Sequence, residues 1–430
     1  MKVLVVGSGG REHALAWRLA QGGGIQIYAT PGNPGIASLA TCLPVAQTDV
    51  AALASAAADL GIGLTVVGPE APLAAGLADA FAAQGLKVFG PSAAAAQIEA
   101  SKAFAKSLMR RWQIPTADFK AFDDSSDAIS YVRRSSGRVV VKADGLAAGK
   151  GVVVARTAAE AETAVADFMV RRVHGPAGAR VVIEECLDGE EASVLALVCG
   201  ERVWPLVPVQ DYKRAGDGDN GPNTGGMGAI APAPLPGGLM GQVIDQILEP
   251  VAAAMAREGR PYTGVLYAGI MVTADGPKVL EFNCRFGDPE AQVILPLLQG
   301  SFADILLDVV DGRTPPLRWS TGAAACVVLA SGGYPGHYRT GFPIAGLEQV
   351  PQDIRVFHAG TAVADARLVT AGGRVFNAVG LGPTLEGAVS RAYAGVAPIL
   401  FDGMQYRSDI GRGIHTVRQA ELASAPGGTE

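Results

Sequence analysis

Residues 2–90 repeat one pattern: a short apolar run, a turn rich in glycine or proline, and an alanine- and leucine-rich segment. The apolar runs are residues 3–6, 25–29, 64–67 and 87–89. Buried strands that alternate with helices predict an open parallel sheet, and ligands bind such sheets at the carboxyl ends of their strands. The turns expected at those ends are residues 7–10, 31–35 and 68–72.

A different pattern follows, in which two valine-rich runs flank a glycine-rich loop at residues 144–151. Three residues separate Gly145 from Gly149, and Gly151 follows Lys150, so the loop lacks the spacing of a phosphate-binding P-loop. It also joins strand to strand, which favours a hairpin flap that folds over phosphates. Lys142 lies inside the first valine-rich run. Because burial of an unpaired ammonium group is costly, Lys142 indicates an anionic partner.

A third apolar run, Val265 to Val272, turns back through Asp275-Gly276 and predicts a β-hairpin. Strand alternation places Glu281 and Asn283 on one face, and Leu280 and Phe282 on the other. Two oxygen ligands on a rigid strand suit Mg²⁺, which completes its shell with phosphate and water. Arg285 adds a fixed positive charge for a phosphate or carboxylate. The alternative is a strand end whose polar groups are merely solvated.

Three other segments shape the expected fold. Residues 92–111 are expected to form one helix that carries Lys102 and Lys106 one turn apart. The glycine-rich stretch 215–228 is typical of a long functional or mobile loop. From residue 321 onward the pattern predicts a small α+β closing domain with few chemically active residues.

Composition narrows the functional classes. The chain has 430 residues, 49% of them hydrophobic and 18% charged, as in soluble proteins of more than one domain. Its net charge of −6 argues against a nucleic-acid partner. The cysteines number 5 and form no Cys-x-x-Cys pair, which indicates reduced thiols in the cytoplasm. No apolar stretch is long enough for a signal peptide or a membrane span, so we expect a cytoplasmic protein without a membrane partner.

The first glycine-rich turn tests a dinucleotide-binding interpretation. That fingerprint needs glycine at positions 7, 9 and 12, but position 12 is Glu12. An NAD-dependent oxidoreductase is therefore disfavoured. The helix N-terminus remains suited to a phosphate or sugar, and a purely structural turn is the alternative.

Several strings resemble the phosphoribosylamine–glycine ligases, the glycinamide ribonucleotide synthetases of the ATP-grasp superfamily. They are residues 7–13, 67–73, 142–151, 223–228 and 285–290, and the resemblance extends to about residue 420. It implies an α/β and α+β chain in which an open parallel Rossmann-like (pre-ATP-grasp) domain spans 1–98. A two-subdomain ATP-grasp fold would span 99–318, with a mobile lid at about 119–189. A small α+β domain would span 319–423, before a frayed tail at 424–430.

The resemblance also implies a reaction. Glycine would be joined to 5-phosphoribosylamine at the expense of ATP, through glycyl phosphate, in the second step of de novo purine biosynthesis. ATP and Mg²⁺ (or Mn²⁺) would be required, and we expect a monomer, with a weak homodimer as the alternative. Competing hypotheses are another ATP-grasp carboxylate–amine ligase and a nucleotide-binding protein without catalytic activity.

By the same resemblance, site residues fall into four groups. The implied catalytic residues are Lys142, Arg285 and Asp288, and the metal ligands are Glu281 and Asn283. Nucleotide would contact Lys102, Lys142, Gly149, Lys150, Gly151, Glu184, Glu185, Leu187 and Glu190. Substrate would contact Gly9, Gly10, Glu70, Asp211, Gly225 and Gly226. The family usually has histidine where this chain has Tyr212, which would alter the local geometry if that histidine contacts substrate.

Overall fold

The computed structural model describes residues 1–135, 138–147 and 149–412. The predicted frayed tail at 424–430 and Ala148 of the glycine-rich loop lie outside these ranges. All five cysteines are free thiols, in line with their odd number. Within the described ranges, every helix is too short or too polar to cross a membrane.

The N-terminal domain is the predicted open parallel sheet, with strand order β3-β2-β1-β4-β5. Its strands are β1 (Lys2–Gly7), β2 (Gln26–Pro31), β3 (Thr41–Cys42), β4 (Leu64–Val67) and β5 (Val88–Phe89). Its helices are α1 (Gly10–Ala20), α2 (Pro34–Ala37), α3 (Val50–Leu60), α4 (Glu70–Ala74) and α5 (Leu77–Ala82). The strand order reverses between β1 and β4, so the glycine turns after these two strands border one crevice.

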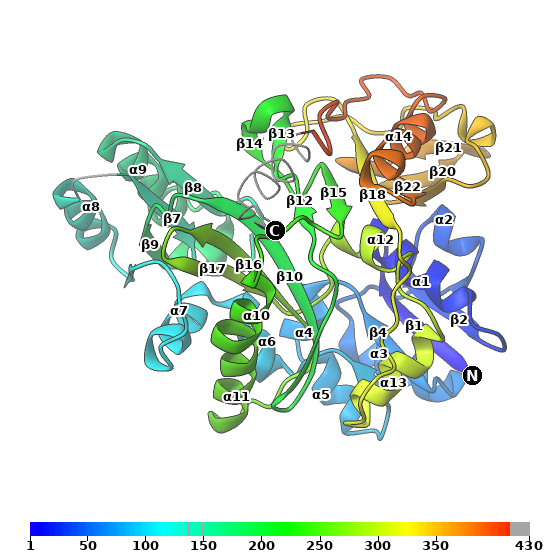
Figure 1. Cartoon of the computed structure of the whole chain (residues 1–430), viewed down its shortest axis with the longest axis horizontal. Helices are drawn as coiled ribbons and strands as arrows, with labels where there is room; N and C mark the ends of the chain where they lie inside the picture. The colour runs from blue at the N-terminus through cyan, green and yellow to red at the C-terminus, as the bar shows by residue number, and fades with distance from the viewer. Residues whose placement is uncertain (136–137, 148, 413–430) are drawn as a thin grey trace, which may run out of the picture.

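The second unit is a four-stranded antiparallel sheet that stands apart at one side of the molecule (Figure 1). It contains β6 (Phe119–Phe122), β9 (Val181–Glu185), β7 (Val139–Ala143) and β8 (Val152–Ala155). Its helical segments are α8 (Ser125–Arg134), α9 (Ala158–Val165), η1 (Ala166–Val170) and η2 (Gly175–Ala179). These elements bury a core of their own, including Val141, Val165 and Ile183. We call this unit the lid.

The lid faces a second antiparallel sheet made of β11 (Arg202–Pro205), β10 (Glu190–Cys199), β16 (Thr263–Thr273) and β17 (Gly276–Asn283). Its helical segments are α6 (Ala93–Ala100), α7 (Lys102–Arg111), α10 (Leu239–Val243), η4 (Ile244–Leu248) and α11 (Glu249–Arg257). The predicted β16–β17 hairpin is confirmed, with Thr273 paired to Gly276 across the turn.

Two expectations, one about the β16–β17 hairpin and one about the helix before the lid, need correction. The register of β16–β17 shifts after Gly269, which pairs with Glu281 while Ile270 pairs with Val279. Leu280 is therefore an extra residue in the strand, and it lies outside the core that holds Phe282. The expected single helix at 92–111 is two helices, because Ser101 has an extended backbone and its Oγ caps α7 at Phe104 N.

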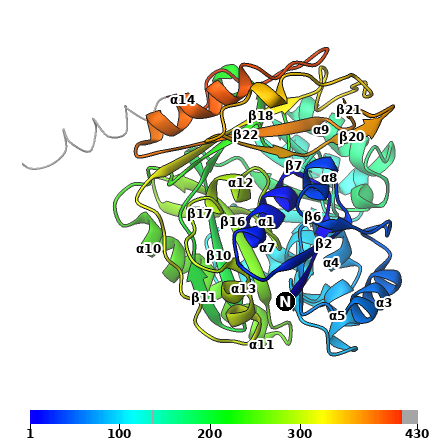
Figure 2. The ribbon, with the colours of Figure 1, turned by 90° about the vertical axis from the view of Figure 1, so that its right-hand side faces the viewer.

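The C-terminal sheet has strand order β12-β15-β18-β22-β19. It contains β18 (Ala323–Ala330), β19 (Arg355–His358) and β22 (Arg374–Gly382), and also β12 (Gln210–Asp211) and β15 (Gly228–Ala231). Its strands β18 and β22 lie in the upper part of the view in Figure 2. Around the sheet lie β13 (Arg214–Gly216), η3 (Asp217–Asp219), β14 (Asn220–Asn223), α12 (Glu290–Ile294), η5 (Leu347–Gln349), β20 (Thr361–Ala364), β21 (Arg367–Thr370) and α14 (Leu385–Val396). Helix α13 (Phe302–Val310) instead packs against β5, β10 and β16. Two strands thus come from the middle of the chain, on either side of the stretch expected to be loop.

Candidate active site

Glu281 and Asn283 lie at the end of β17, opposite Gly269 and Tyr267 of β16. The amide Oδ1 of Asn283 accepts a hydrogen bond from Arg285 Nη2 at 3.3 Å. Within the described ranges, no side chain or backbone group donates a hydrogen bond to the Glu281 carboxylate. Both residues therefore offer oxygen atoms that a cation could use.

Positive charge surrounds Glu281. Burial alone would raise the pKa of its carboxyl, but four nearby cations together lower it: Lys213, Lys142, Lys102 and Arg285. The part of the chain that the structure describes contains no cluster of three or more His, Cys, Asp or Glu that could hold a metal by itself. An ionised carboxylate and an amide fit Mg²⁺, which takes one or two protein ligands and fills its shell with phosphate and water.

Lys142 has the anionic partner that its position predicted. Its Nζ lies 3.0 Å from Oε1 of Glu184 and donates to Leu280 O at 2.9 Å. Lys106 Nζ lies 2.7 Å from the other oxygen of Glu184, and all three side chains are buried. Burial, followed by the charge of Lys142, lowers the pKa of Lys106 to about 8. The helical spacing predicted only that Lys106 neighbours Lys102, and in the structure Lys106 forms this ion pair with Glu184.

The glycine-rich loop joins β7 to β8, as predicted, and lies against two other segments. Lys102 Nζ donates to Gly145 O at 3.3 Å, and burial lowers the pKa of Lys102. At the other end of the loop, Gly149 has φ +75°, and a Cβ there would lie 3.6 Å from Thr224 O. The loop tip is therefore in van der Waals reach of the 223–228 segment, while Lys150 is exposed and Gly151 is buried.

The expected adenine-binding residues lie where the lid joins the second sheet. Glu184 is committed to the lysine pair, whereas Glu185 is exposed and its Oε1 accepts from Asp118 N at 3.0 Å. Leu187 lies between β9 and β10, and the exposed Glu190 begins β10. Their contacts with a nucleotide stay a prediction.

Arg285 is the centre of a partly buried ion cluster. Its Nε lies 3.1 Å from Glu70 Oε2 and its Nη2 lies 2.9 Å from Glu99 Oε1. The second oxygen of Glu99 accepts from Cys284 N at 2.7 Å. The guanidinium charge is thus already balanced within the protein, and the same group fixes the amide of Asn283. Glu99 was not anticipated, because it lies in a helix remote in sequence.

Buried hydrogen bonds link Glu290 to Asp211 through the hydroxyls of Tyr267 and Ser193. Tyr267 Oη donates to Glu290 Oε1 at 3.0 Å and lies 2.7 Å from Ser193 Oγ. Ser193 in turn donates to Asp211 Oδ1 at 3.0 Å, and Lys213 Nζ lies 3.8 Å from Asp211 Oδ2. Burial and the charge of Asp211 raise the pKa of Glu290 to about 7. Burial likewise raises the pKa of Asp211. Two carboxyl groups are thus joined through two hydroxyls.

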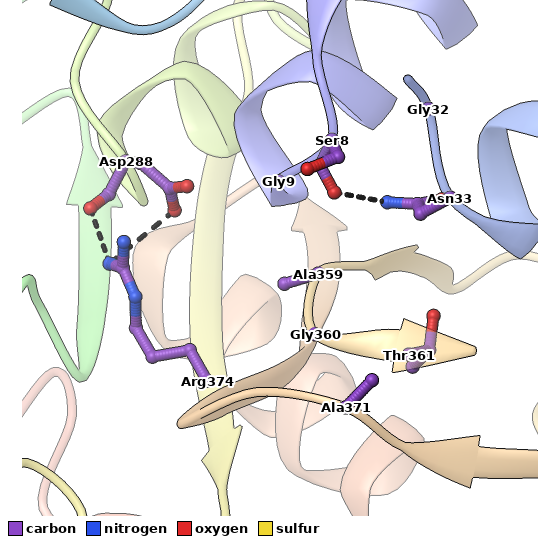
Figure 3. A pocket seen from close by; sticks show the side chains of 10 residues that line it. All are labelled: Ser8, Gly9, Gly32, Asn33, Asp288, Ala359, Gly360, Thr361, Ala371 and Arg374. Atoms are coloured by element: carbon purple, nitrogen blue, oxygen red, sulfur yellow. Dashed lines mark hydrogen bonds and ion pairs between the residues drawn. The ribbon is translucent and has the colours of Figure 1, made fainter. Parts of the chain in front are cut away.

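A polar cavity of about 320 Å³ opens between the N-terminal and C-terminal domains (Figure 3). From the C-terminal domain it is lined by Ala359, Gly360, Thr361, Ala371 and Arg374. The other lining residues are Ser8, Gly9, Gly32, Asn33 and Asp288. Arg374 Nη1 donates to Asp288 O at 2.6 Å and to Gly225 O at 2.7 Å. Burial would raise the pKa of Asp288, but Arg374 and Arg11 hold it below its ordinary value. Sequence reasoning missed Arg374, because the C-terminal domain was expected to be poor in chemistry.

The expected substrate glycines occupy different surroundings. Gly9 lines the cavity, and its N–H donates to Glu12 Oε2 at 2.5 Å. Gly10 is buried, and a Cβ there would clash with Asn377, whose Nδ2 would lie only 2.1 Å away. Gly225 and Gly226 pack against Arg374 and Pro289, respectively. Glu70 belongs to the Arg285 cluster and is not part of the cavity wall.

A Rossmann-like domain, a lid and a second antiparallel sheet that enclose lysines around a carboxylate–amide pair define an ATP-grasp protein. The N, ATP-grasp (A) and C domains of phosphoribosylglycinamide synthetase match residues 1–99, 100–291 and 324–413. The chain belongs to the phosphoribosylglycinamide synthetase family.

Sequence similarity to individual relatives extends along nearly the whole chain. It is 50% identical to the phosphoribosylamine–glycine ligase of Halalkalibacterium halodurans, over 96% of each chain. It is 52% identical to that of a Nostoc species, over 96% of this chain and 99% of the relative. The crystal structure of the Thermotoga maritima phosphoribosylamine–glycine ligase superposes with a TM-score of 0.85 at 34% identity, covering 96% of this chain and all (100%) of that one. A biotin carboxylase domain from Hydrogenobacter thermophilus, crystallised with MgADP and bicarbonate, shares the fold at 17% identity and a TM-score of 0.73, over 98% and 94% of the two chains.

Proposed function

We propose that this protein joins glycine to 5-phosphoribosylamine, giving glycinamide ribonucleotide, ADP and phosphate. Membership of the phosphoribosylglycinamide synthetase family supports this reaction. The structural observation that carries it is the Glu281 carboxylate, kept ionised among Lys102, Lys142 and Lys213. Such a site suits a triphosphate and its divalent cation better than any neutral ligand.

The first step activates glycine. A carboxylate is a poor electrophile, so one oxygen of glycine attacks the γ-phosphorus of ATP, and the bond from that phosphorus to the ADP oxygen breaks. Mg²⁺ held by Glu281 and Asn283 would neutralise charge on the phosphates. Lys102 and Lys142 orient them, because phosphoryl transfer depends on position and charge more than on covalent chemistry. Water would hydrolyse the glycyl phosphate, so the loop at 144–151 covers it.

The second step forms the amide. The amine of phosphoribosylamine attacks the acyl carbon, the carbon–oxygen bond to phosphate breaks, and the nitrogen loses one proton. The buried chain from Glu290 to Asp211 offers two carboxyl groups with raised pKa values, and that of Glu290, raised to about 7, suits proton acceptance near neutrality.

The cavity between the outer domains is the proposed site of the sugar phosphate. Asn33 and Thr361 offer hydrogen bonds, and Arg374 offers positive charge beside Asp288. Gly9 allows the backbone to approach the ligand closely. Glycine would then lie between this cavity and the Glu281 site, near Asp211 and the Gly225–Gly226 turn.

The test is release of ADP in a coupled assay with ATP, glycine and freshly generated phosphoribosylamine. We expect turnover only when all three are present, and a product with the mass of glycinamide ribonucleotide. ADP release with formate or bicarbonate in place of glycine would favour another carboxylate-activating ligase. Tight nicotinamide binding, or nucleotide binding without turnover, would contradict the proposal.

We also propose a cytoplasmic monomer that uses Mg²⁺ or Mn²⁺. Sedimentation equilibrium measures the mass in solution, and a dimer would contradict the first part. Activity after chelation and addition of each metal measures the second.

A further inference from the structure

Tyr212 lies on the opposite side of its extended segment from Asp211 and packs in the core of the C-terminal sheet. Its neighbour Asp211 joins the hydrogen-bond chain to Ser193, and consecutive residues of extended backbone point to opposite sides. Tyr212 is 7% exposed and belongs to the core of the C-terminal sheet. Its Oη accepts a hydrogen bond from Gly411 N at 2.9 Å. The Tyr212 side chain therefore contacts the segment around Gly411 and takes no part in the hydrogen-bond chain of Asp211.

Arg407 covers the ring of Tyr212. Its guanidinium carbon lies 5.0 Å from the ring centroid, and the side chain is 1% exposed. Nη1 lies 2.7 Å from Asp219 Oδ1, and Nη2 lies 2.7 Å from Asp409 Oδ2. A third contact, from Nη1 to Arg214 O at 3.3 Å, reaches the strand that follows Tyr212. A buried arginine with this many acceptors is held in one orientation.

The same two segments are joined a second time beside Arg407. Ser408 N donates to Asp217 Oδ1, and Gly218 N donates to Asp409 Oδ2, each at 2.8 Å. The β13–β14 hairpin is therefore pinned to residues 407–411 by contacts in both directions. We call Tyr212, Arg407 and these carboxylate contacts the clamp.

The clamp reaches the active site through the backbone. Met227 N donates to Tyr212 O at 2.7 Å, and Thr224 N donates to Lys213 O at 2.8 Å. These bonds fix the segment that contains Thr224, whose carbonyl oxygen would lie 3.6 Å from a Cβ placed at Gly149 of the lid loop. They also fix the backbone of Lys213, whose Nζ lies 3.0 Å from Glu191 Oε2 and 3.8 Å from Asp211 Oδ2 in the proposed site.

We propose that Tyr212 and Arg407 are positioning residues: by tying residues 407–411 to the 211–227 segment, they hold Lys213 and Thr224 where the lid loop and the nucleotide phosphates must meet them. The role of Lys213 and Thr224 rests on the proposed ligase function. The tie itself rests only on the contacts above. A loosened segment would reach the competent arrangement a smaller fraction of the time, which weakens apparent nucleotide affinity by that fraction.

Three variants and one control test this proposal. Tyr212→Phe removes the hydroxyl and keeps the ring under Arg407, while Arg407→Gln removes the charge, and Arg407→Lys retains a charge near the aspartates. The control is Arg391→Gln, because Arg391 also lies in the C-terminal domain but contacts Leu381 O and Asp353. Thermal unfolding of each variant verifies that it folds.

Hydrogen exchange is the readout that needs no turnover. Amides of Thr224, Gly226 and Met227 should exchange about five- to tenfold faster in Tyr212→Phe and Arg407→Gln than in the wild type. Amides of β18 and β22 should be unchanged, as should all of these amides in the control. Unchanged exchange in both variants, or an equal rise throughout the C-terminal domain, overturns the proposal.

Kinetics supply the second readout. In Tyr212→Phe and Arg407→Gln, KM for ATP should rise about tenfold while kcat changes much less, and Arg407→Lys should recover part of the loss. Loosened amides with unaltered KM for ATP would overturn the positioning role. A wild-type protein without ligase activity would contradict the proposed function instead, and ATP affinity measured by calorimetry would then replace KM in the same comparison.

Discussion

Lys142 and Glu184 face each other from neighbouring strands of the lid sheet, with Nζ and Oε1 3.0 Å apart. Lys106 approaches the same carboxylate from α7. Two ammonium groups thus share one carboxylate in a buried setting, and the trio keeps a net positive charge. A buried excess charge requires a partner, and we propose that a phosphate group of the nucleotide supplies it.

Replacement of Lys142 should therefore have two separable effects. Lys142→Met leaves Glu184 paired with Lys106, which removes the excess charge, and should lower stability by at most about 1 kcal/mol. It should also lower kcat/KM for ATP, and the fall should correspond to a loss of about 2–4 kcal/mol of transition-state stabilisation. Urea unfolding and steady-state kinetics measure the two effects.

The double variant Lys142→Met/Glu184→Gln separates them. Stability should fall by about 3 kcal/mol in the double variant, because Lys106 then keeps a buried charge without its carboxylate, while the activity should stay low. Wild-type activity in Lys142→Met would mean that Lys142 serves the protein interior alone.

Glu281→Gln should abolish most activity and leave the fold intact, since it changes a proposed metal ligand and little volume. We expect kcat/KM to fall roughly a hundredfold or more, with a higher Mg²⁺ concentration needed for half-maximal rate. Asp275→Asn, at the exposed turn of the same hairpin, is the matched control. Equal turnover of Glu281→Gln and wild type at ordinary Mg²⁺ would refute the metal assignment.

Glu12, which departs from the dinucleotide fingerprint, depends on Gly68 for space. A Cβ at Gly68 would lie 2.0 Å from Glu12 Oε1, and Glu12 is buried. Gly68→Ala should therefore displace Glu12 from Gly9 N and cost about 1–3 kcal/mol of stability. Gly23→Ala, where a Cβ meets nothing within 4 Å, should be nearly neutral. Similar urea midpoints for the two variants would show that Glu12 relocates freely.

Local patterns in the sequence predicted local structure well. Asp275-Gly276 between two apolar runs gave the β16–β17 hairpin, and the alternating runs of residues 2–90 gave the parallel sheet. What escaped prediction depends on contacts between distant segments. Glu99 meets Arg285 across 186 positions, and Arg374 meets Asp288 across 86. No local propensity encodes these pairs, so the composition of the cavity and of the Arg285 cluster became visible only in the folded chain.

The same limit hid the pairing of β12 and β15 with the C-terminal sheet. These short strands flank a glycine-rich stretch whose pattern resembles loop, and they acquire their conformation from β18. The expected boundary at residue 319 stays a prediction, because this sheet draws strands from both sides of it.

His13 and His358 join the N-terminal and C-terminal domains and should make the protein sensitive to acid. His13 Nδ1 accepts a hydrogen bond from His358 N at 2.8 Å, which requires an unprotonated Nδ1. Burial lowers the pKa of His13 to about 3, with a contribution from His358, and burial lowers the pKa of His358 to about 4. Unfolded histidines take up protons below about pH 6.5, so stability should fall as pH drops from that value toward 4. The free energy of unfolding, measured with urea at pH 7 and at pH 4.5, should fall by roughly 2 kcal/mol less in His13→Gln than in the wild type. An identical loss in wild type and variant would mean that other groups, such as the carboxylates around Arg285, govern acid unfolding.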